Sequence, residues 1–514
     1  MGRNRQIPYC NLLAILLLAV PLANATLDQA ALLRQFIASR SRAQSLDLEG
    51  PAETDPWADP ASSFGHLPTD CKNPKGSKEA DRITALPGQP PRVNFEQYAG
   101  YVTVDEEHDR SSSTTSSSPP TTPPPSPSSS GSTEPCNLYV FCTRAGPGCS
   151  SLGAGAMQEL GPFRVNPDGK TLSRNRHAWN NVANVIFLES PAGVGFSYSN
   201  TSSDYDLSGD RRTAVDSYTF MLHWLERFPE YKGRDFYIAG ESYAGHYVPE
   251  LAAVIVAIRK FTGKNPTSLK GIFVGNPYLD NYKNEKGGLE FLWNHGVMSD
   301  EVWADITEHC SFGPSEGLLC HRAKASFDPG NIDPYHIYAP ICIEEPNGTT
   351  HSTGYLPGYD PCIKYYVPAY FNRLEVQEAI HARVNTRWST CTHNILHWNW
   401  KEAPVSMVPT LSWLVRNGLR VWLYSGDMDD VCPITATRYS VQDLNLTITK
   451  PWRPWYTPAN EVGGYIQQYK GGFTFASVRG AGHLVPSFQP KRSLVLFYSF
   501  LKGVLPPAVS LWQP

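Results

Sequence analysis

An α/β fold with a mostly parallel central sheet is the class that the sequence predicts, and two observations lead to it. Short apolar runs that each end in glycine or another turn residue are typical of strands buried on both faces. These runs are VANVIFLES, DFYIAG, LKGIFVGNP, LRVWLYSGD and FTFASVRGAG. Between them lie helical patterns such as RTAVDSYTFMLHWLERF, in which apolar residues recur at helical spacing. Strands that alternate with helices predict a sheet that is mostly parallel and flanked by helices.

Length and charge limit what such a fold could do. The chain has 514 residues, a formal net charge of -4 and a hydrophobic fraction of 41%. This is enough material for one large domain or two medium ones. A near-neutral balance without a dense Lys/Arg block argues against nucleic acid as the main partner.

The N-terminus has the pattern of a secretory signal. A basic head is followed by an apolar run from Leu12 to Leu22 and a small-residue cleavage site, Ala23-Asn24-Ala25. A membrane helix needs about 20 apolar residues, so this run is too short to span a bilayer. We therefore expect residues 1–25 to be a signal peptide, and the product to be secreted or vacuolar without a membrane partner. Residues 26–80 read as a propeptide or loose N-terminal arm, and the globular pattern extends over residues 81–514.

Eleven cysteines are present, and the first leaves with the signal. In an oxidising compartment the others are disulfide candidates before they are metal ligands. No Cys-x-x-Cys pair and no His-Glu-x-x-His occurs, so we expect neither a metal site nor another cofactor. Spacing suggests two local pairs, Cys310 with Cys320 and Cys342 with Cys362. Cys149 and Cys391 would each need a distant partner.

Residues 281–392 break the rhythm of strands and helices. This segment holds five of the eleven cysteines and many prolines, and it indicates an inserted cap stapled by disulfides. Three N-glycosylation acceptors are expected in a secreted chain: Asn200, Asn347 and Asn445.

The stretch DFYIAGESYAGHYVPELA places a serine at a turn between a strand and a helix. Such a turn needs small neighbours, because the backbone is tight and the helix packs close to the strand. Ser242 is therefore the candidate nucleophile, with Ala244 and Gly245 as the small neighbours. The alternative is an ordinary strand–turn–helix unit with a chance serine.

Candidate partners for this serine follow two later strands. LRVWLYSGDMDDVCP places Asp427, Asp429 and Asp430 after one strand, and FTFASVRGAGHLVP places His483 after another. Serine, acid and histidine in this order are typical of α/β-hydrolases. The histidine would take the proton from the serine, and a carboxylate would orient and stabilise the imidazolium.

At this point the chain resembles the serine carboxypeptidases, the secreted α/β-hydrolases of plants, fungi and animals. The resemblance covers about residues 83–110 and 146–506, and it is carried by GPGCSSLGAGAMQELGPF, ESPAGVGFSYS, GESYAGHYVPELA, GDMDDVCP and GAGHLVP. It implies that Ser242 is the nucleophile, Asp429 orients the histidine and His483 is the base. It further implies that the backbone N–H groups of Gly146 and Tyr243 form the oxyanion hole.

The same resemblance implies three disulfides and an assembly state. The pairs are Cys149–Cys391, Cys310–Cys320 and Cys342–Cys362. Relatives from plants are often cut within the insertion into two linked chains and often dimerise, so both are expectations here. Cys432, close to Asp429, is expected to be a free buried thiol.

Two glutamates connect the resemblance to peptide C-termini as the substrate. In this family Glu241 and the glutamate matching Glu159 grip the terminal carboxylate of the substrate. Two acids that face a third carboxylate cannot all be ionised, which predicts peptidase activity favoured at acidic pH. An acyltransferase that uses sugar-ester donors is the first alternative. Family members with that activity usually have Asp before the serine, so Glu241 favours the peptidase.

The run TTSSSPPTTPPPSPSSSG does not fit the pattern of a folded core. The family has a strand resembling KPLVLWLNGG at this place, and its Asn and first Gly bind the substrate carboxylate, whereas Arg144 and Ala145 stand here. A hinge or an O-glycosylated stalk would replace a central strand by a loop of more than about 20 residues.

A shifted reading frame accounts for the composition of this run. Moving a GC-rich reading of Lys-Pro-Leu-Val-Leu-Trp-Leu-Asn-Gly by one nucleotide gives Ser-Pro-Ser-Ser-Ser-Gly-Ser-Thr, which is residues 126–133. We therefore interpret residues 111–145 as a frame-shifted, low-complexity segment. We expect the chain as written to lack a central strand, which leaves a catalytically dead product as the second alternative.

Overall fold

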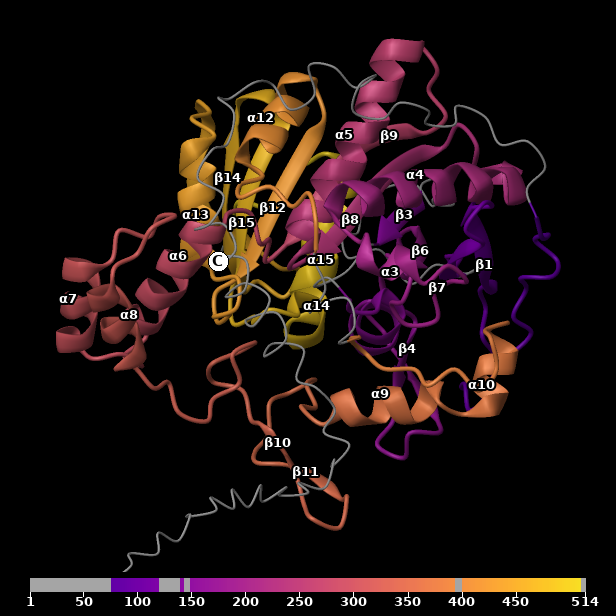
Figure 1. The fold of residues 1–514 in the computed structure, drawn as a ribbon, viewed down its shortest axis with the longest axis horizontal. Helices are drawn as coiled ribbons and strands as arrows, with labels where there is room; N and C mark the ends of the chain where they lie inside the picture. Colours follow the sequence, from indigo (N-terminus) through magenta and orange to yellow (C-terminus); the bar gives the residue numbers. More distant parts are fainter. Residues whose placement is uncertain (1–74, 120–138, 143–147, 393–399, 510–514) are drawn as a thin grey trace, which may run out of the picture.

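A computed structural model describes residues 75–119, 139–142, 148–392 and 400–509. An eleven-stranded sheet runs through this part of the chain (Figure 1). From one edge to the other its strands are β1 (Gln97–Asp105), β2 (Arg110–Ser117), β6 (Asn184–Leu188), β3 (Tyr139–Cys142), β8 (Asp235–Glu241), β9 (Ser268–Gly275), β12 (Arg420–Gly426), β15 (Phe473–Val478), β14 (Val462–Tyr469) and β13 (Ile448–Tyr456), and β7 (Tyr198–Ser199) pairs with β2.

The centre of the sheet is parallel and both of its ends are antiparallel. Every neighbouring pair from β6 to β15 runs parallel. The pairs β1–β2 and β2–β6 at one end, and β15–β14 and β14–β13 at the other, are antiparallel. The edge strand β13 contains Pro451 and Pro454, which have no N–H to donate and so suit an edge. The predicted mostly parallel sheet is confirmed.

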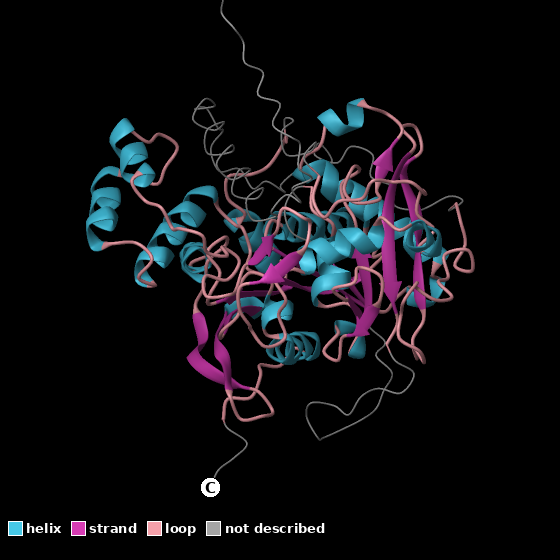
Figure 2. Cartoon of the chain, turned by 90° about the horizontal axis from the view of Figure 1, so that it is seen from below, coloured by secondary structure: helices cyan, strands magenta, loops and turns pink. Residues whose placement is uncertain are grey.

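Helices cover both faces of the sheet, as the view in Figure 2 shows. The helix α5 (Ala244–Thr262) packs on β8 and β9, and α4 (Asp210–Arg227) and α12 (Val408–Arg416) pack beside it. On the other face, aromatic side chains of α15 (Pro490–Lys502) meet the sheet, with Phe500 at 4.9 Å from Phe273 between ring centroids. None of the helices that the structure describes has the length and apolar character needed to cross a bilayer.

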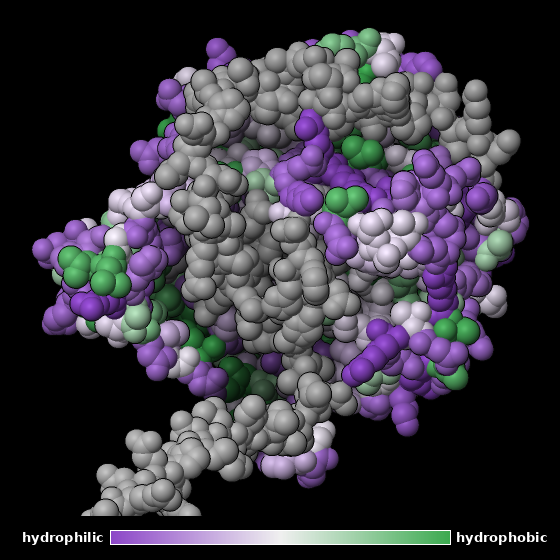
Figure 3. Space-filling view, viewed as in Figure 1, coloured by the Kyte–Doolittle hydropathy of each residue, from purple (hydrophilic) through white to green (hydrophobic). Residues whose placement is uncertain are grey.

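The predicted insertion forms a border along one side and the lower rim of the body (Figure 1). Helices α7 (Asp300–His309) and α8 (Leu318–Ala325) project as a lobe and enclose a small apolar cluster around Ile306. Two exposed leucines, Leu318 and Leu319, begin α8, and Figure 3 shows an apolar spot on this lobe. The elements are α6 (Asn281–Asn294), α7 (Asp300–His309), α8 (Leu318–Ala325), β10 (Cys342–Glu344), β11 (Thr350–Ser352), α9 (Ile363–Phe371) and α10 (Leu374–Ala379).

Three disulfides join this segment internally and to the body. Each matches a predicted pair: Cys149–Cys391, Cys310–Cys320 and Cys342–Cys362. Shorter elements complete the described chain: β4 (Phe163–Val165), β5 (Leu172–Arg174), α3 (Ser203–Asp206), α13 (Ile434–Asp443), α14 (Val485–Phe488), the π-helix η1 (Ser151–Glu159) and the 3-10 turns η2 (Trp179–Asn181), η3 (Pro229–Tyr231) and η4 (Lys470–Gly472).

The expectation that residues 111–145 leave the sheet without a central strand is wrong. The C-terminal end of this segment supplies β3, which is fully buried between β6 and β8. Its N-terminal end supplies most of β2, whose serine and threonine side chains are nearly all buried. Strand pairing explains why this polar sequence forms β2, because the backbone groups of neighbouring strands can hydrogen-bond to it whatever its side chains are. The frame-shift hypothesis concerns the transcript and stays a prediction; Arg144, Ala145 and Gly146 lie outside the described residues.

Candidate active site

Ser242 lies on a tight turn between β8 and α5. Its φ of 64° is in the left-handed region, which a non-glycine residue occupies only at a cost. Its backbone N–H donates to the carbonyl of Gly275 at 3.0 Å. A Cβ on Gly245 would lie 2.3 Å from the carbonyl oxygen of Tyr278, so the start of α5 tolerates only a very small residue there. The local structure therefore has the features that the sequence predicted for a nucleophile turn.

Asp429 follows β12 and accepts a hydrogen bond from His483 Nδ1 at 2.8 Å. The carboxylate also accepts from the backbone N–H groups of Val431 at 2.9 Å and Cys432 at 3.2 Å, and from Asn276 Nδ2 at 2.7 Å. An ionised carboxylate only accepts, so the proton lies on Nδ1 and the lone pair on Nε2. This is the tautomer that a general base needs.

The neighbouring acids have other contacts. Asp427 accepts a hydrogen bond from the backbone N–H of Gly480 at 2.6 Å, and burial raises the pKa of its carboxyl. Asp430 is buried as well, and its backbone N–H donates to the carbonyl of Pro334. Among the three predicted acids, Asp429 is the one that is hydrogen-bonded to the histidine.

The serine and the histidine are not hydrogen-bonded to each other in this structure. Ser242 Oγ and His483 Nε2 are both buried and have no hydrogen-bond partner among the described residues. Hydrogen bonds to two consecutive residues place Ser242 near Asp429: the Ser242 N–H donates to the Gly275 carbonyl, and the next residue, Asn276, donates to the Asp429 carboxylate. The free thiol of Cys432 is buried nearby; burial raises its pKa, and the Asp429 charge raises it further. Catalytic hydrogen bonds are often long without substrate, so this geometry is compatible with a triad.

Two residues that the sequence reasoning missed support the histidine and the acid. The ring of Tyr335, from the insertion, stacks on the imidazole of His483 with 4.5 Å between centroids. Its carbonyl oxygen accepts from the backbone N–H of His483 at 2.6 Å. Asn276 has a φ of 39°, and its position directly after β9 was a usable signal, because Asn tolerates that conformation. No sequence pattern pointed to Tyr335.

A fully buried carboxylate, that of Asp210, lies behind the nucleophile turn. It accepts hydrogen bonds from the Tyr243 hydroxyl at 3.0 Å, His246 Nδ1 at 2.9 Å and Trp400 Nε1 at 2.8 Å. These contacts fix the start of α5 and Tyr243, the residue before it, whose N–H is one of the two predicted oxyanion donors. The other predicted donor, Gly146, lies outside the described residues.

Glu159 and Glu241 line the same small cavity, although they come from η1 and from the end of β8. They are only 1% and 4% exposed. The cavity has a volume of about 20 Å³, which is room for roughly one water molecule. Cys142 lies in the same lining, and burial together with the charge of Glu159 raises the pKa of its thiol. The structure thus brings the two acids to one place beside Ser242.

A serine on a strained strand–helix turn and an acid–histidine pair beyond the next strands define a serine hydrolase of the α/β-hydrolase fold. A family model for serine carboxypeptidases matches residues 138–503. The chain therefore belongs to the serine carboxypeptidase family, which is a family of serine-type hydrolases.

Individual relatives agree with this assignment. Serine carboxypeptidase-like 40 of Arabidopsis thaliana is 46% identical over 454 residues, which cover 85% of this chain and 86% of the relative. Serine carboxypeptidase 24 of the same plant is 46% identical over 448 residues, covering 83% and 93%. A crystal structure of Kex1ΔP, a prohormone-processing carboxypeptidase from Saccharomyces cerevisiae, shares the fold with a TM-score of 0.66 and 22% identity, covering 83% of this chain and 96% of that one.

Proposed function

We propose that this protein removes C-terminal residues from peptides and proteins by covalent serine catalysis. Ser242 Oγ attacks the last peptide carbonyl while His483 Nε2 takes its proton, and Asp429 stabilises the imidazolium that forms. The N–H groups of Tyr243 and Gly146 hold the oxyanion, each donor being worth about 3 kcal/mol in the transition state. The histidine then protonates the leaving amine, and water attacks the acyl-enzyme by the same route in reverse.

The hydrogen bond between His483 and Asp429 at 2.8 Å is the observation that supports a triad most directly. The preference for a chain end is supported by the buried pair of Glu159 and Glu241 at one cavity. A pair of carboxyl groups that shares a proton can hydrogen-bond a substrate carboxylate, whereas the middle of a peptide offers no such charge.

An acyltransferase reaction is the second candidate, because the acyl-enzyme could be released by an alcohol in place of water. Two assays separate the two activities: hydrolysis of an N-blocked dipeptide, and acyl transfer from a glucose ester to a small alcohol. Dipeptide hydrolysis with no transfer supports the peptidase. Transfer without peptide hydrolysis overturns it.

A fluorescent organophosphonate tests whether the chain is catalytically competent at all. We expect labelling of the protein and no labelling of the Ser242→Ala variant. A folded protein that is not labelled would favour a catalytically dead product of an altered gene.

We further propose that the protein follows the secretory route and is secreted or vacuolar. The three disulfides support an oxidising compartment. The predicted signal at residues 1–25 lies outside the described residues. N-terminal sequencing of the mature protein tests the signal, and light scattering during gel filtration tests the expected homodimer.

A further inference from the structure

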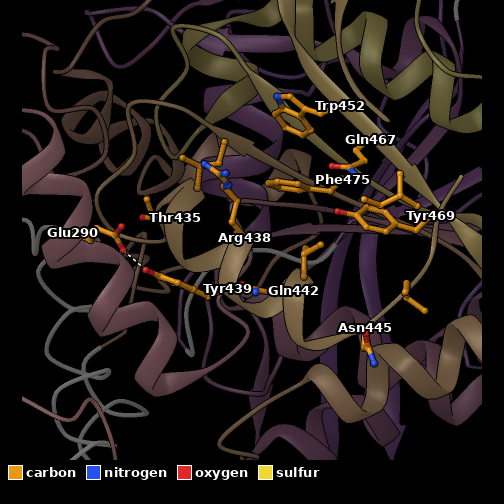
Figure 4. Close-up of a pocket in the computed structure, with 14 residues that line it drawn as sticks. Glu290, Thr435, Arg438, Tyr439, Gln442, Asn445, Trp452, Gln467, Tyr469 and Phe475 are labelled. Carbon is orange, nitrogen blue, oxygen red and sulfur yellow. Dashed lines mark hydrogen bonds between the residues drawn. The ribbon is translucent and has the colours of Figure 1, made fainter. Parts of the chain in front are cut away.

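A second concave site lies between α13 and the end of the sheet formed by β13, β14 and β15, and it shares no lining residue with the candidate active site (Figure 4). Its volume is about 710 Å³, which is within the range of sites for small organic ligands. We call it the α13 groove. Six residues set its chemistry: Arg438, Gln442, Trp452, Gln467, Tyr469 and Phe475.

The α13 groove combines aromatic faces with polar edges. Trp452 stacks on Phe475 with 5.7 Å between centroids, and it is still 42% exposed although it is a large aromatic residue. The side chains of Gln442, Gln467 and Arg438 add hydrogen-bonding groups around these rings. A pyranose sugar has matching chemistry, since its C–H faces are apolar and its hydroxyl edges are polar.

A glycosylation acceptor lines the same groove. Asn445 begins the Asn-Leu-Thr tripeptide, is exposed, and lies two residues beyond the end of α13. In Figure 4 it lies at one end of the groove and Trp452 lies toward the other. Its exposed side chain can rotate, because the terminal torsion of Asn is broad.

We propose that the α13 groove binds the N-linked glycan carried by Asn445. The first N-acetylglucosamine units of this glycan pack against Trp452 and Tyr469. This proposal rests on the proposed secretory route. A tethered ligand has an effective concentration in the millimolar range. Sugar–aromatic contacts that would be too weak for a free sugar therefore suffice to keep the attached glycan in the groove.

The glycoprotein provides its own control at a second acceptor. Asn347 is exposed and lies between β10 and β11, at the turn of a hairpin that projects from the body (Figure 1). The native glycoprotein is treated with an endoglycosidase, and release is followed separately at Asn347 and Asn445 by mass spectrometry of the glycopeptides. We expect release at Asn445 to be at least about tenfold slower than at Asn347, and equal rates after denaturation.

Substitution of the groove separates sugar binding from simple crowding. An aromatic contact is worth about 0.5–1.5 kcal/mol, so Trp452→Ala should speed release at Asn445 roughly 3- to 10-fold and leave Asn347 unchanged. Gln467→Ala is the second variant if the first folds poorly, and a thermal unfolding curve checks that each variant is folded.

Three results would overturn the proposal. The first is equal native release at the two acceptors, and the second is an Asn445 rate that neither substitution changes. The third is the absence of a glycan at Asn445 in a protein that is glycosylated at Asn347. If that protein is also a dimer that Trp452→Ala dissociates, the groove is an interface between chains. All readouts can be taken on the Ser242→Ala protein, so they do not depend on the proposed activity.

Discussion

Replacing either carboxyl group of the buried pair should change how peptide hydrolysis depends on pH. Glu159 and Glu241 are almost fully buried, so a substrate carboxylate that hydrogen-bonds to them is poorly screened by solvent. A hydrogen bond to a charged group contributes about 1.5–3 kcal/mol, and about 1.4 kcal/mol corresponds to a factor of ten. We therefore expect kcat/KM for a blocked dipeptide to fall about 10- to 150-fold when such a hydrogen bond to the substrate carboxylate is lost.

The sign of this effect follows from the charges. A protonated carboxyl group can donate to the substrate carboxylate, whereas two ionised carboxylates would repel it. We therefore expect binding to weaken as the pH rises. Glu241→Gln and Glu159→Gln each keep a donor that cannot ionise, so their profiles should fall less between pH 5 and 8.

The assay compares pH profiles for a dipeptide with a free carboxylate and for the same dipeptide with a C-terminal amide. The amide carries no charge and should not show the falling limb. The reasoning is refuted if both substrates fall in parallel, or if hydrolysis of the free dipeptide rises steadily to pH 8.

Three further predictions concern stability and the support of the catalytic groups. Burial raises the pKa of Glu189 from 4.5 to about 7, so its stabilising contribution is complete below pH 4.5 and is lost as the pH rises toward 7. Urea denaturation should show that the free energy of unfolding of the wild type falls by up to about 3 kcal/mol over this pH range, and that Glu189→Gln does not show this fall. Gly245→Ala forces a Cβ against the carbonyl of Tyr278 and should cost about 1–3 kcal/mol together with most activity. Gly313→Ala, where a Cβ would meet only Ser311 Oγ at 3.6 Å, should leave both unchanged. Tyr335→Ala removes a ring that stacks on the proposed base and should lower kcat about 3- to 10-fold, whereas Tyr335→Phe should keep the wild-type rate; equal losses in both variants would exclude a role for stacking.

The parts of the fold that could be predicted are those where the local pattern and the tertiary environment agree. The apolar runs before Ser242, Asp429 and His483 became parallel strands because buried strands require such residues on both faces. The position of Asn276 after a strand was a usable signal, but its contact with Asp429 and that of the Tyr335 carbonyl with His483 could not be predicted, because each spans more than a hundred residues of chain.

The serine-rich strand β2 is the clearest failure of local reasoning. A polar run predicts a loop, yet six of its serine and threonine side chains are buried in the sheet. The Thr114 hydroxyl donates a hydrogen bond to the carbonyl of Phe187 at 3.0 Å, while Ser117 Oγ has no hydrogen-bond partner in the described part of the chain. Each unpaired buried hydroxyl costs about 1–3 kcal/mol. A core strand of this composition is what a shifted reading frame would produce, and sequencing the cDNA across residues 105–150 decides the question.

The pattern of disulfides has a consequence for proteolytic maturation. The segment between Cys320 and Cys342 lies between the two local disulfides. Of the three bonds in the part of the chain that the structure describes, only Cys149–Cys391 joins a residue before this segment to a residue after it. A nick in that segment would leave Ser242 on one polypeptide and the acid and histidine on the other. Such a two-chain enzyme would be held covalently by a single sulfur bridge, and a reducing gel would resolve it into two bands.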